Sequence, residues 1–428
     1  MAAPHPLAAP DPRSASPPRR RFGEPRPELG EAPVRDSEVF FSRTDARGLI
    51  LSGNEVFRRV TDHDWETLIG TPHALTRHPD MPRGIFWLLW ERLSRGRPTG
   101  VYLKNRARDG LWYWVFAIVT PVEGGYLSVQ LKPTSAGLAQ VRRDYADQLA
   151  LEGEQALSPD AAGTAFLTRL GDLGYPSYDS FMAHALAAEI TARADAATRP
   201  ANPALGQFST LTKEVALVEE ITREVADSFA AIRNVPTNLR ILATRLEAAG
   251  GPISVISTNY AAISAEIHAW TDRLLQDGDG AFGRIRTALD AALFLQGAAE
   301  IQDEALAQFR TERRRGPAGG DAATATDIAL LEHQAAVFRD RAREGLDRVA
   351  VEAEGFARAI VEMKRLVIGL SSTRMLCKIE GARRAQDGDG LDEIIRQLDG
   401  FQVMVERHLA RRGEVNRLVQ ACAGALRG

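Results

Sequence analysis

The stretch that decides the fold is TGVYLKNRARDGLWYWVFAIVTPVEGGYLSVQL, residues 99–131. Three β-like runs in it are rich in β-branched and aromatic residues: Thr99 to Leu103, Trp112 to Val119 and Tyr126 to Leu131. Arg108-Asp109-Gly110 and Gly124-Gly125 separate these runs and are typical of hairpin turns. The stretch therefore predicts three consecutive antiparallel strands in a meander.

The residues before this stretch add two more strands and short helices. Val39-Phe40-Phe41 and Leu49-Ile50-Leu51 are short β-like runs on either side of a turn signal. Residues 54–60 read as a short helix, and residues 81–93 read as a helix behind Pro82. We therefore expect an α+β domain over residues 37–133, with a five-stranded antiparallel sheet and short helices on one face.

The regions on either side of this domain differ from it in composition. Residues 1–36 hold nine of the 22 prolines and the run Arg19-Arg20-Arg21, which predicts a disordered tail, or alternatively a short basic anchor. From residue 138 to 428, apolar residues recur at steps of three and four, as at Val215, Val218 and Ile221. This spacing predicts long helices packed as a bundle or coiled coil, with possible hairpins over 206–276 and 366–410.

Length, charge and cysteine content exclude several classes of protein. The 428 residues suggest two or three domains. A net charge of −3, from 53 basic and 56 acidic residues, argues against a nucleic-acid binder. The two cysteines cannot build a disulfide framework or a four-thiolate zinc site, and no apolar run is long enough to span a membrane. With no apolar core of a signal peptide at the N-terminus, we expect a cytoplasmic protein.

The sharpest polar motif is Thr76-Arg77-His78-Pro79-Asp80-Met81-Pro82. It places Arg77, His78 and Asp80 in a loop at the start of a predicted helix, whose free N–H groups carry positive potential. Such a loop suits an anionic or carbonyl-rich ligand. The alternative is a purely structural loop in which Asp80 caps the helix.

Residues 38–131 resemble a PAS domain, and specifically that of the flavin-binding aerotaxis receptors. The strings that carry the resemblance include Ser52-Gly53-Asn54-Glu55-Val56-Phe57, Leu68-Ile69-Gly70-Thr71-Pro72-His73, Arg77-His78-Pro79-Asp80-Met81-Pro82, Lys104-Asn105-Arg106 and Tyr113-Trp114-Val115. The resemblance implies a PAS fold that encloses a ligand. In that family the ligand is often FAD, whose redox state reports oxygen or respiratory state.

The resemblance also implies a set of flavin-binding residues: Asn54, Arg77, His78, Asp80, Phe86, Trp90 and Asn105. The residue types agree with a planar ligand, since amide side chains can pair with the polar edge of a flavin ring and aromatic side chains can stack on its face. For each aromatic residue the alternative is an ordinary core position. The sequence departs from the family at Thr99-Gly100, where an aromatic residue is missing, and at Leu111, which replaces a polar residue.

Two other cofactors can be compared with a flavin. A haem would need an axial histidine, for which His78 and His73 are the candidates. Light sensing through a cysteinyl–flavin adduct is not expected, because residues 37–133 contain no cysteine.

The helical region bears a weaker resemblance to the signalling hairpin of chemoreceptors. Thr237 to Ala249 resembles its outgoing arm, Ile253 to Ser257 its returning arm, and Gly250-Gly251-Pro252 a shortened tip. A second, partial echo lies at Ile379 to Arg383. The resemblance implies a homodimer with a signalling partner, such as a chemotaxis kinase or coupling protein. Any hairpin rich in Ala, Glu and Leu would give a similar pattern.

Signatures of catalysis are missing from the sequence. It has no phosphate-binding Gly-Lys-Ser/Thr loop, and its eight histidines are scattered. We therefore expect a sensor that is not an enzyme. The resemblance implies that its PAS domain binds FAD and relays the redox state of the FAD to the helices. The alternative from another class is a scaffold whose PAS domain is empty and whose helices bind partner proteins.

Overall fold

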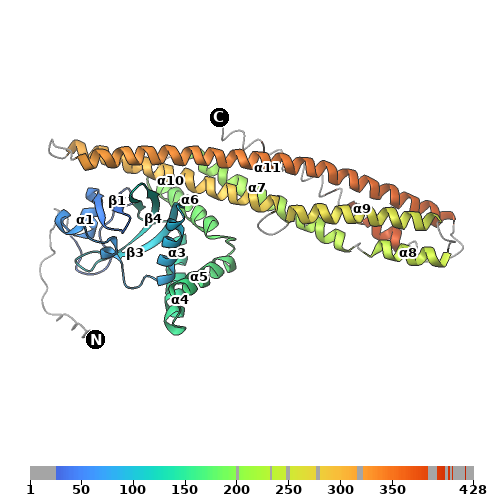
Figure 1. The fold of residues 1–428 in the computed structure, drawn as a ribbon, viewed down its shortest axis with the longest axis horizontal. Helices are drawn as coiled ribbons and strands as arrows, with labels where there is room; N and C mark the ends of the chain where they lie inside the picture. Colours follow the sequence, from blue (N-terminus) through green and yellow to red (C-terminus); the bar gives the residue numbers. More distant parts are fainter. Residues whose placement is uncertain are drawn as a thin grey trace. The chain divides into compact units, whose positions relative to one another are not determined.

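The computed structural model describes residues 26–198, 202–231, 234–246, 251–275, 280–315, 322–383 and 393–400, with a few single positions beyond them. The chain divides into two compact units. The first consists of Met1–Pro200 and Gly297–Ala336, and the second of Ala201–Gln296 and Val337–Gly428. Figure 1 labels most of their helices and the strands β1, β3 and β4.

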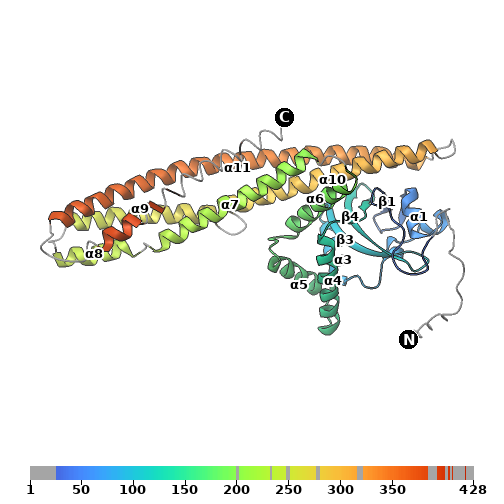
Figure 2. The same ribbon diagram turned by 180° about the vertical axis from the view of Figure 1, so that it is seen from behind.

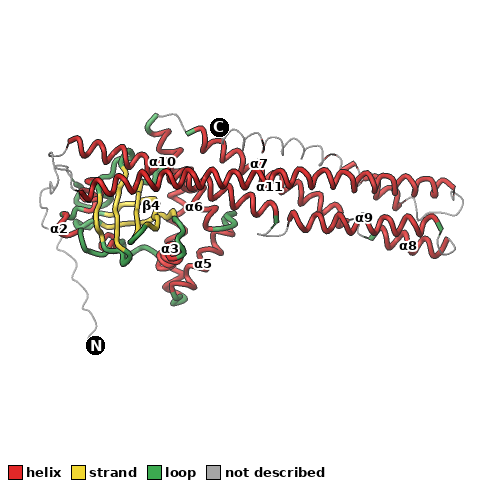
Figure 3. Tube along the Cα trace, turned by 45° about the horizontal axis from the view of Figure 1, so that its top comes forward, coloured by secondary structure: helices red, strands yellow, loops and turns green. Residues whose placement is uncertain are grey.

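The first unit is built on one antiparallel sheet. Its strands are β1 (Val39–Asp45), β2 (Ile50–Gly53), β3 (Thr99–Arg106), β4 (Trp112–Val122) and β5 (Gly125–Leu131), in the spatial order β2-β1-β5-β4-β3. The strands lie side by side in Figure 3. The expected five-stranded sheet and its meander are thereby confirmed.

Local turn chemistry sets the two hairpins of the meander. Gly110 and Gly124 have φ values of +91° and +79°, a backbone region that favours glycine. Across the second turn, Val122 of β4 pairs with Gly125 of β5. The register then continues to Phe116 and Leu131, so that alternate side chains of both strands face the same side of the sheet.

Short helices cover the inner face of the sheet: α1 (Glu55–Thr61), α2 (Trp65–Leu68), the 3-10 helix η1 (His73–Thr76) and α3 (Arg83–Ser94). Asn54 caps α1, because its side-chain oxygen accepts the N–H of Phe57 at 3.1 Å.

Three further helices follow the sheet directly: α4 (Gly137–Glu154), α5 (Pro159–Asp172) and α6 (Tyr178–Ala196). The hydroxyl groups of Tyr145 and Tyr178 donate to the backbone carbonyls of Tyr102 and Gly100 at 3.1 and 2.9 Å. Side chains of α4 and α6 therefore satisfy backbone groups of β3, which is an edge strand. Figure 2 shows α3, α4 and α5 together beside the sheet.

The outer face of the sheet is covered as well, which the sequence did not predict. Parts of α10 (Ala281–Arg315) and α11 (Ala322–Arg383) belong to the first unit and pack on β1. Phe309 of α10 contacts Phe41 edge to face, and Asp327 of α11 pairs with Arg43.

Part of the expected N-terminal tail is ordered against the domain. The Arg26 guanidinium is buried and donates to the Asp109 carboxylate at 2.6 Å, and the N–H of Ala32 donates to the carbonyl of Trp112 at 2.8 Å. The prediction of a disordered tail over 1–36 is therefore wrong for residues 26–36, because these polar contacts anchor the segment. Residues 1–25 lie outside the described residues.

The second unit consists of helices, as expected. It contains α7 (Pro203–Ala231), α8 (Val235–Leu246), α9 (Pro252–Leu275) and the remaining parts of α10 and α11. The Ser257 hydroxyl of α9 donates to the carbonyl of Pro236 in α8 at 2.7 Å, and the Trp270 indole donates to the carbonyl of Ala359.

The tips of the two hairpins expected from sequence lie partly or wholly outside the described residues, which omit 247–250 and 384–392. For the region 366–410, Asp399 forms ion pairs with Arg374 and Lys378 of α11 at 2.5 and 2.9 Å. Within the described part of the chain, none of the helices is both long enough and apolar enough to cross a bilayer.

Candidate ligand pocket

A cavity of about 190 Å³ lies between the inner face of the sheet and the short helices. The strands contribute Thr44, Leu103, Asn105, Val119, Tyr126, Ser128 and Gln130 to its wall. The segment from β2 to β3 contributes Pro72, His73, Ala74, Thr76, Arg77, Phe86, Leu89, Trp90 and Leu93. The pocket therefore lies where a PAS fold was expected to enclose a ligand.

The alternation of strand residues explains which side chains reach the pocket. Tyr126, Ser128 and Gln130 are every second residue of β5, and Leu103 and Asn105 are two apart on β3. Because successive side chains of a strand point to opposite faces, each set faces the same side of the sheet.

Aromatic side chains flank the pocket on the helical side. The Trp90 ring meets the Tyr126 ring edge to face, with 5.2 Å between the centroids, and Trp90 is 45% exposed. The Arg77 guanidinium lies 3.7 Å from the centroid of the Phe86 ring, a cation–π contact. A planar ligand entering beside Trp90 would meet aromatic surface on this side.

The charged side chains of the pocket wall are two arginines. Arg47 and Arg77 line the pocket, its lining residues include no Asp or Glu, and Arg47 is paired with Asp45 at 3.1 Å. Burial lowers the pKa of Arg77 from its ordinary value, yet an arginine stays protonated at neutral pH. Within the described ranges, no carboxylate lies at ion-pair distance from Arg77. The pocket therefore offers a partly buried cation to an anionic or carbonyl-rich group.

His73 supplies a neutral polar group at the same wall. Its Nε2 lies 3.1 Å from the Ser42 hydroxyl, and its ring stacks on Phe57. Burial lowers the pKa of His73 to about 4, because the protonated form loses hydration there. The imidazole is therefore neutral at pH 7.

Two amide side chains also face the pocket. The Gln130 amide donates to the Ser128 hydroxyl at 3.0 Å, and Gln130 is buried. Asn105 is 5% exposed, and its backbone forms a bridge to that of Arg77. Each amide can donate and accept hydrogen bonds, as the polar edge of a heterocycle requires.

Four of the seven predicted site residues line the pocket: Arg77, Phe86, Trp90 and Asn105. The other three, Asn54, His78 and Asp80, are not among its lining residues. Asn54 accepts the N–H groups of Phe41 and Phe57 and donates to the carbonyl of Val39, so its side chain acts within the protein fold.

His78 and Asp80 lie in the loop before α3. The Asp80 carboxylate pairs with Lys104 at 2.6 Å, and this hydrogen bond lowers the pKa of Asp80. The alternative interpretation, in which Asp80 caps the following helix, is wrong: the N–H groups of Arg83 and Gly84 donate to Glu152 at 2.8 and 2.9 Å.

Sequence reasoning missed several pocket residues on β1, η1 and β5: Thr44, Thr76, Tyr126, Ser128 and Gln130. For the residues on β1 and β5, the signal that could have found them was the two-residue alternation along predicted strands. Once Tyr126 is placed on the inner face, Ser128 and Gln130 follow it.

Comparison with known proteins agrees with this geometry. A family model described as a PAS fold matches residues 50–130. An aerotaxis receptor from Escherichia coli strain K12 is 36% identical over 118 residues, which cover 26% of this chain and 23% of that protein. A nitrogen fixation regulatory protein from Klebsiella pneumoniae is 35% identical over 89 residues, 21% of this chain and 18% of that protein. The chain thus spans about a fifth of the length of these relatives.

Solved structures of similar fold include the light state of the blue-light photoreceptor Aureochrome1 LOV. That likeness has 23% identity and a TM-score of 0.21, and it covers 27% of this chain and 91% of the other. The five-stranded sheet, the pocket and the sequence matches all lie in the same part of the chain. The chain therefore contains a PAS domain over residues 50–130, similar in sequence to that of an aerotaxis receptor.

Proposed function

We propose that the PAS domain binds a flavin, FAD, in this pocket and that the chain is a redox sensor of the aerotaxis type. The observation that carries the proposal is the position of Arg77. It is a partly buried cation without a carboxylate partner in the described structure, in the wall of a pocket that also holds aromatic rings and amides.

The polar groups of the pocket suit the edge of a flavin ring. Asn105 and Gln130 supply amide donors and acceptors from two strands, and Ser128 holds the Gln130 amide. Arg77 would attract carbonyl oxygens or a phosphate group, because charge-assisted hydrogen bonds are the stronger ones. Phe86 and Trp90 add aromatic surface for stacking.

The volume of the pocket limits how much of the ligand it holds. At about 190 Å³ it is smaller than the roughly 300–1,000 Å³ typical of sites for drug-sized ligands. It therefore suits a ring system, with the rest of a dinucleotide extending past the exposed Trp90.

A bound flavin would supply a reversible redox couple whose protonation changes with its oxidation state. The protein groups at its edge would then have to exchange donor and acceptor roles. The amides of Gln130 and Asn105 can do so by rotating, whereas Arg77 only donates. A change of this kind biases one arrangement of the sheet over another, which is how a ligand shifts a conformational equilibrium.

The output and its partners extend the same proposal. We infer that the helices receive the redox signal, that the chain acts as a homodimer, and that a signalling protein such as a chemotaxis kinase or coupling protein is the partner. The likeness to a receptor and to a regulatory protein supports a role as a signal transducer, and we propose that the chain is not itself an enzyme.

The pocket supports haem binding and an empty scaffold less well than it supports flavin binding. For haem, His73 is the histidine in the pocket wall, and its Nε2 lies 3.1 Å from the Ser42 hydroxyl. His78 is not among the lining residues. A scaffold with an empty PAS domain would leave the Arg77 guanidinium in the pocket wall without an anionic or carbonyl group of a ligand to bind.

The test is the absorption spectrum of the purified full chain, followed by chromatography of any released ligand. Flavin bands support the proposal, a Soret band indicates haem, and a colourless protein indicates the scaffold. Arg77→Ala should weaken flavin binding by about tenfold to a hundredfold, as expected for loss of a hydrogen bond to a charged group. Arg97→Ala, at an exposed arginine outside the pocket lining, is the control and should bind normally.

A further inference from the structure

Strand β1 has one face toward the pocket. Thr44 lines the cavity, and the Ser42 hydroxyl lies 3.1 Å from the Nε2 of the pocket residue His73. These two positions are two residues apart, so both side chains lie on the inner face of the sheet. Any displacement of the pocket wall at His73 or Thr44 therefore acts directly on β1.

The other face of β1 lies against the α10–α11 helices of the same unit. The Phe41 and Phe309 rings meet edge to face with 4.8 Å between centroids. The Arg43 guanidinium donates to Asp327 at 2.7 Å, and Asp327 is only 1% exposed. Alternate residues of one short strand thus connect the pocket to the two helices.

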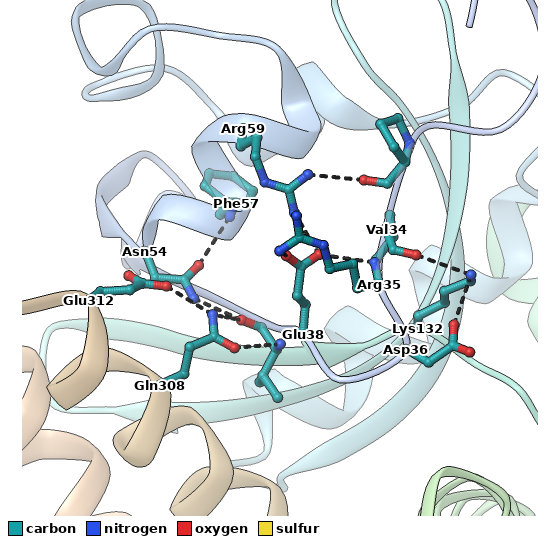
Figure 4. Close-up of polar contacts among 12 residues, drawn as sticks. Val34, Arg35, Asp36, Glu38, Asn54, Phe57, Arg59, Lys132, Gln308 and Glu312 are labelled. Atoms are coloured by element: carbon teal, nitrogen blue, oxygen red, sulfur yellow. Dashed lines mark hydrogen bonds and ion pairs between the residues drawn. The ribbon is translucent and has the colours of Figure 1, made fainter. Parts of the chain in front are cut away.

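A side-chain amide of α10 also holds the backbone of β1. The Gln308 Oε1 accepts the N–H of Val39 at 3.0 Å, and its Nε2 donates to the carbonyl of Val39 at 3.0 Å (Figure 4). Glu312, one turn further along α10, accepts a hydrogen bond from the same Nε2 at 2.9 Å. That bond fixes which way the Gln308 amide faces.

The start of β1 needs this amide because its neighbouring strand stops short. The pairing of β1 with β2 runs from Thr44 to Ser42, opposite Gly53. Beyond it, Asn54 takes the N–H of Phe41 and shares the carbonyl of Val39 with Gln308. Side chains from α10 and from the α1 cap thereby complete the edge where a strand partner is missing.

We propose that Gln308 is the positioning residue through which the state of the PAS pocket reaches the α10–α11 helices. It ties the start of β1 to α10, while pairing with β5 sets the register in which Ser42 and Thr44 face the pocket and Phe41 and Arg43 face the helices. This inference rests on the proposed function in one respect: the change of state is the redox change of the bound flavin.

The coupling has a reciprocal consequence that a purely structural contact lacks. If the redox state changes the docking of α10 on β1, then docked and undocked chains must differ in their redox equilibrium by the same factor, and a variant that undocks α10 shifts that equilibrium. Loss of Gln308 should therefore alter a property of the pocket, although Gln308 itself is not one of its lining residues.

The experiment compares the full chain with Gln308→Ala and with Gln334→Ala as the matched control. Gln334 lies in the α11 part of the same unit and is similarly half-buried, and its side chain forms no hydrogen bond to other described residues. Hydrogen exchange over residues 39–45 and 297–336 is measured in the oxidised and reduced protein, together with the reduction midpoint of the flavin.

In the unsubstituted chain, reduction should change exchange over 297–336. Gln308→Ala should raise exchange there about fivefold or more in both states, as expected for the loss of roughly 1 kcal/mol or more. It should also change the ratio of oxidised to reduced protein at a fixed potential by about fivefold, the lower range of measured couplings. Gln334→Ala should leave both the exchange over 297–336 and the ratio of oxidised to reduced protein unchanged. If Gln308→Ala does not fold, Gln308→Glu keeps the size of the side chain and removes the donor to Val39.

Three outcomes separate this inference from the proposed function. If the flavin is present but exchange over 297–336 ignores its redox state, or if Gln308→Ala leaves the midpoint unchanged, the coupling is wrong and the flavin site stands. If the chain carries no flavin, the proposed function fails. In that case the coupling is tested by hydrogen exchange over residues 72–77. Gln308→Ala should raise exchange in these residues, and Gln334→Ala should not. If Gln308→Ala leaves it unchanged, the coupling is wrong.

Discussion

The Glu152 carboxylate of α4 accepts the backbone N–H of Gly84 in α3 at 2.9 Å, across 68 residues of sequence. It also accepts the N–H of Arg83 at 2.8 Å and is only 2% exposed. A helix that follows the PAS sheet thus caps the helix that carries Phe86 and Trp90 into the pocket.

Replacement of Glu152 should therefore destabilise the first unit. Glu152→Ala removes the acceptor for two N–H groups of α3, and we expect a loss of about 1–2 kcal/mol in the free energy of unfolding. Urea denaturation checks this value. Glu154→Ala, at an exposed residue of the same helix, should stay within about 0.5 kcal/mol of the unsubstituted chain. Equal stabilities for the two variants would contradict the cap.

The packing of α3 on α5 requires glycine. A Cβ at Gly163 would lie 2.4 Å from Cε3 of Trp87, and one at Gly84 would lie 2.6 Å from the backbone carbon of Ala162. Gly163→Ala should therefore cost about 1–3 kcal/mol through overpacking. Gly171→Ala lies in the same helix with no atom within 4 Å of the new Cβ, so it should be neutral or stabilising. The same loss at both positions would indicate a backbone effect instead.

The buried carboxylate of Glu189 fixes the segment between β5 and α4. It accepts hydrogen bonds from the Tyr102 and Ser135 hydroxyls and from the backbone N–H groups of Thr134 and Ser135, at 2.6–2.9 Å. Glu189→Ala leaves these donors buried without an acceptor, so we expect a loss of at least about 3 kcal/mol. Thermal unfolding of Glu189→Ala and of Asp195→Ala, an exposed position on α6, provides the comparison. A small effect at Glu189 would contradict the anchoring role.

The depressed pKa of His73 predicts a dependence of stability on pH. Its pKa is about 4 in the folded chain and about 6.5 when unfolded, so protons bind the unfolded chain first as the pH falls. The stability that the neutral His73 ring contributes is fully present above about pH 6.5 and is lost as the pH falls toward 4. Relative to His73→Gln, the unsubstituted chain should lose about 2 kcal/mol of unfolding free energy between pH 7 and pH 5. Parallel pH profiles for the two proteins would rule this out.

Local patterns were enough to predict the sheet and much of the pocket. The meander follows from alternating runs and glycine turns within residues 99–131, and four of the residues that the resemblance implied, Arg77, Phe86, Trp90 and Asn105, line the pocket. Asn54 was assigned to the ligand, whereas its side chain is engaged in local hydrogen bonds at the start of α1. Capping is a local use of asparagine that the same sequence pattern allows.

The contacts that sequence reasoning could not find join distant segments. Gln308 reaches Val39 across 269 residues, and Glu152 reaches α3 across 68. The sequence around Gln308 and Glu152 does not distinguish them from other polar residues on helices. Tertiary packing determines which distant group each side chain contacts. For the same reason the helices on the outer face of the sheet were not expected.

The most direct test of the central claim is the amount of flavin released from the purified full chain after denaturation. Binding in the pocket beside Arg77 predicts close to one flavin per chain, and a much smaller amount from Arg77→Ala at equal protein concentration. A colourless chain that releases no flavin, or an Arg77→Ala variant that retains the full amount, would contradict the claim.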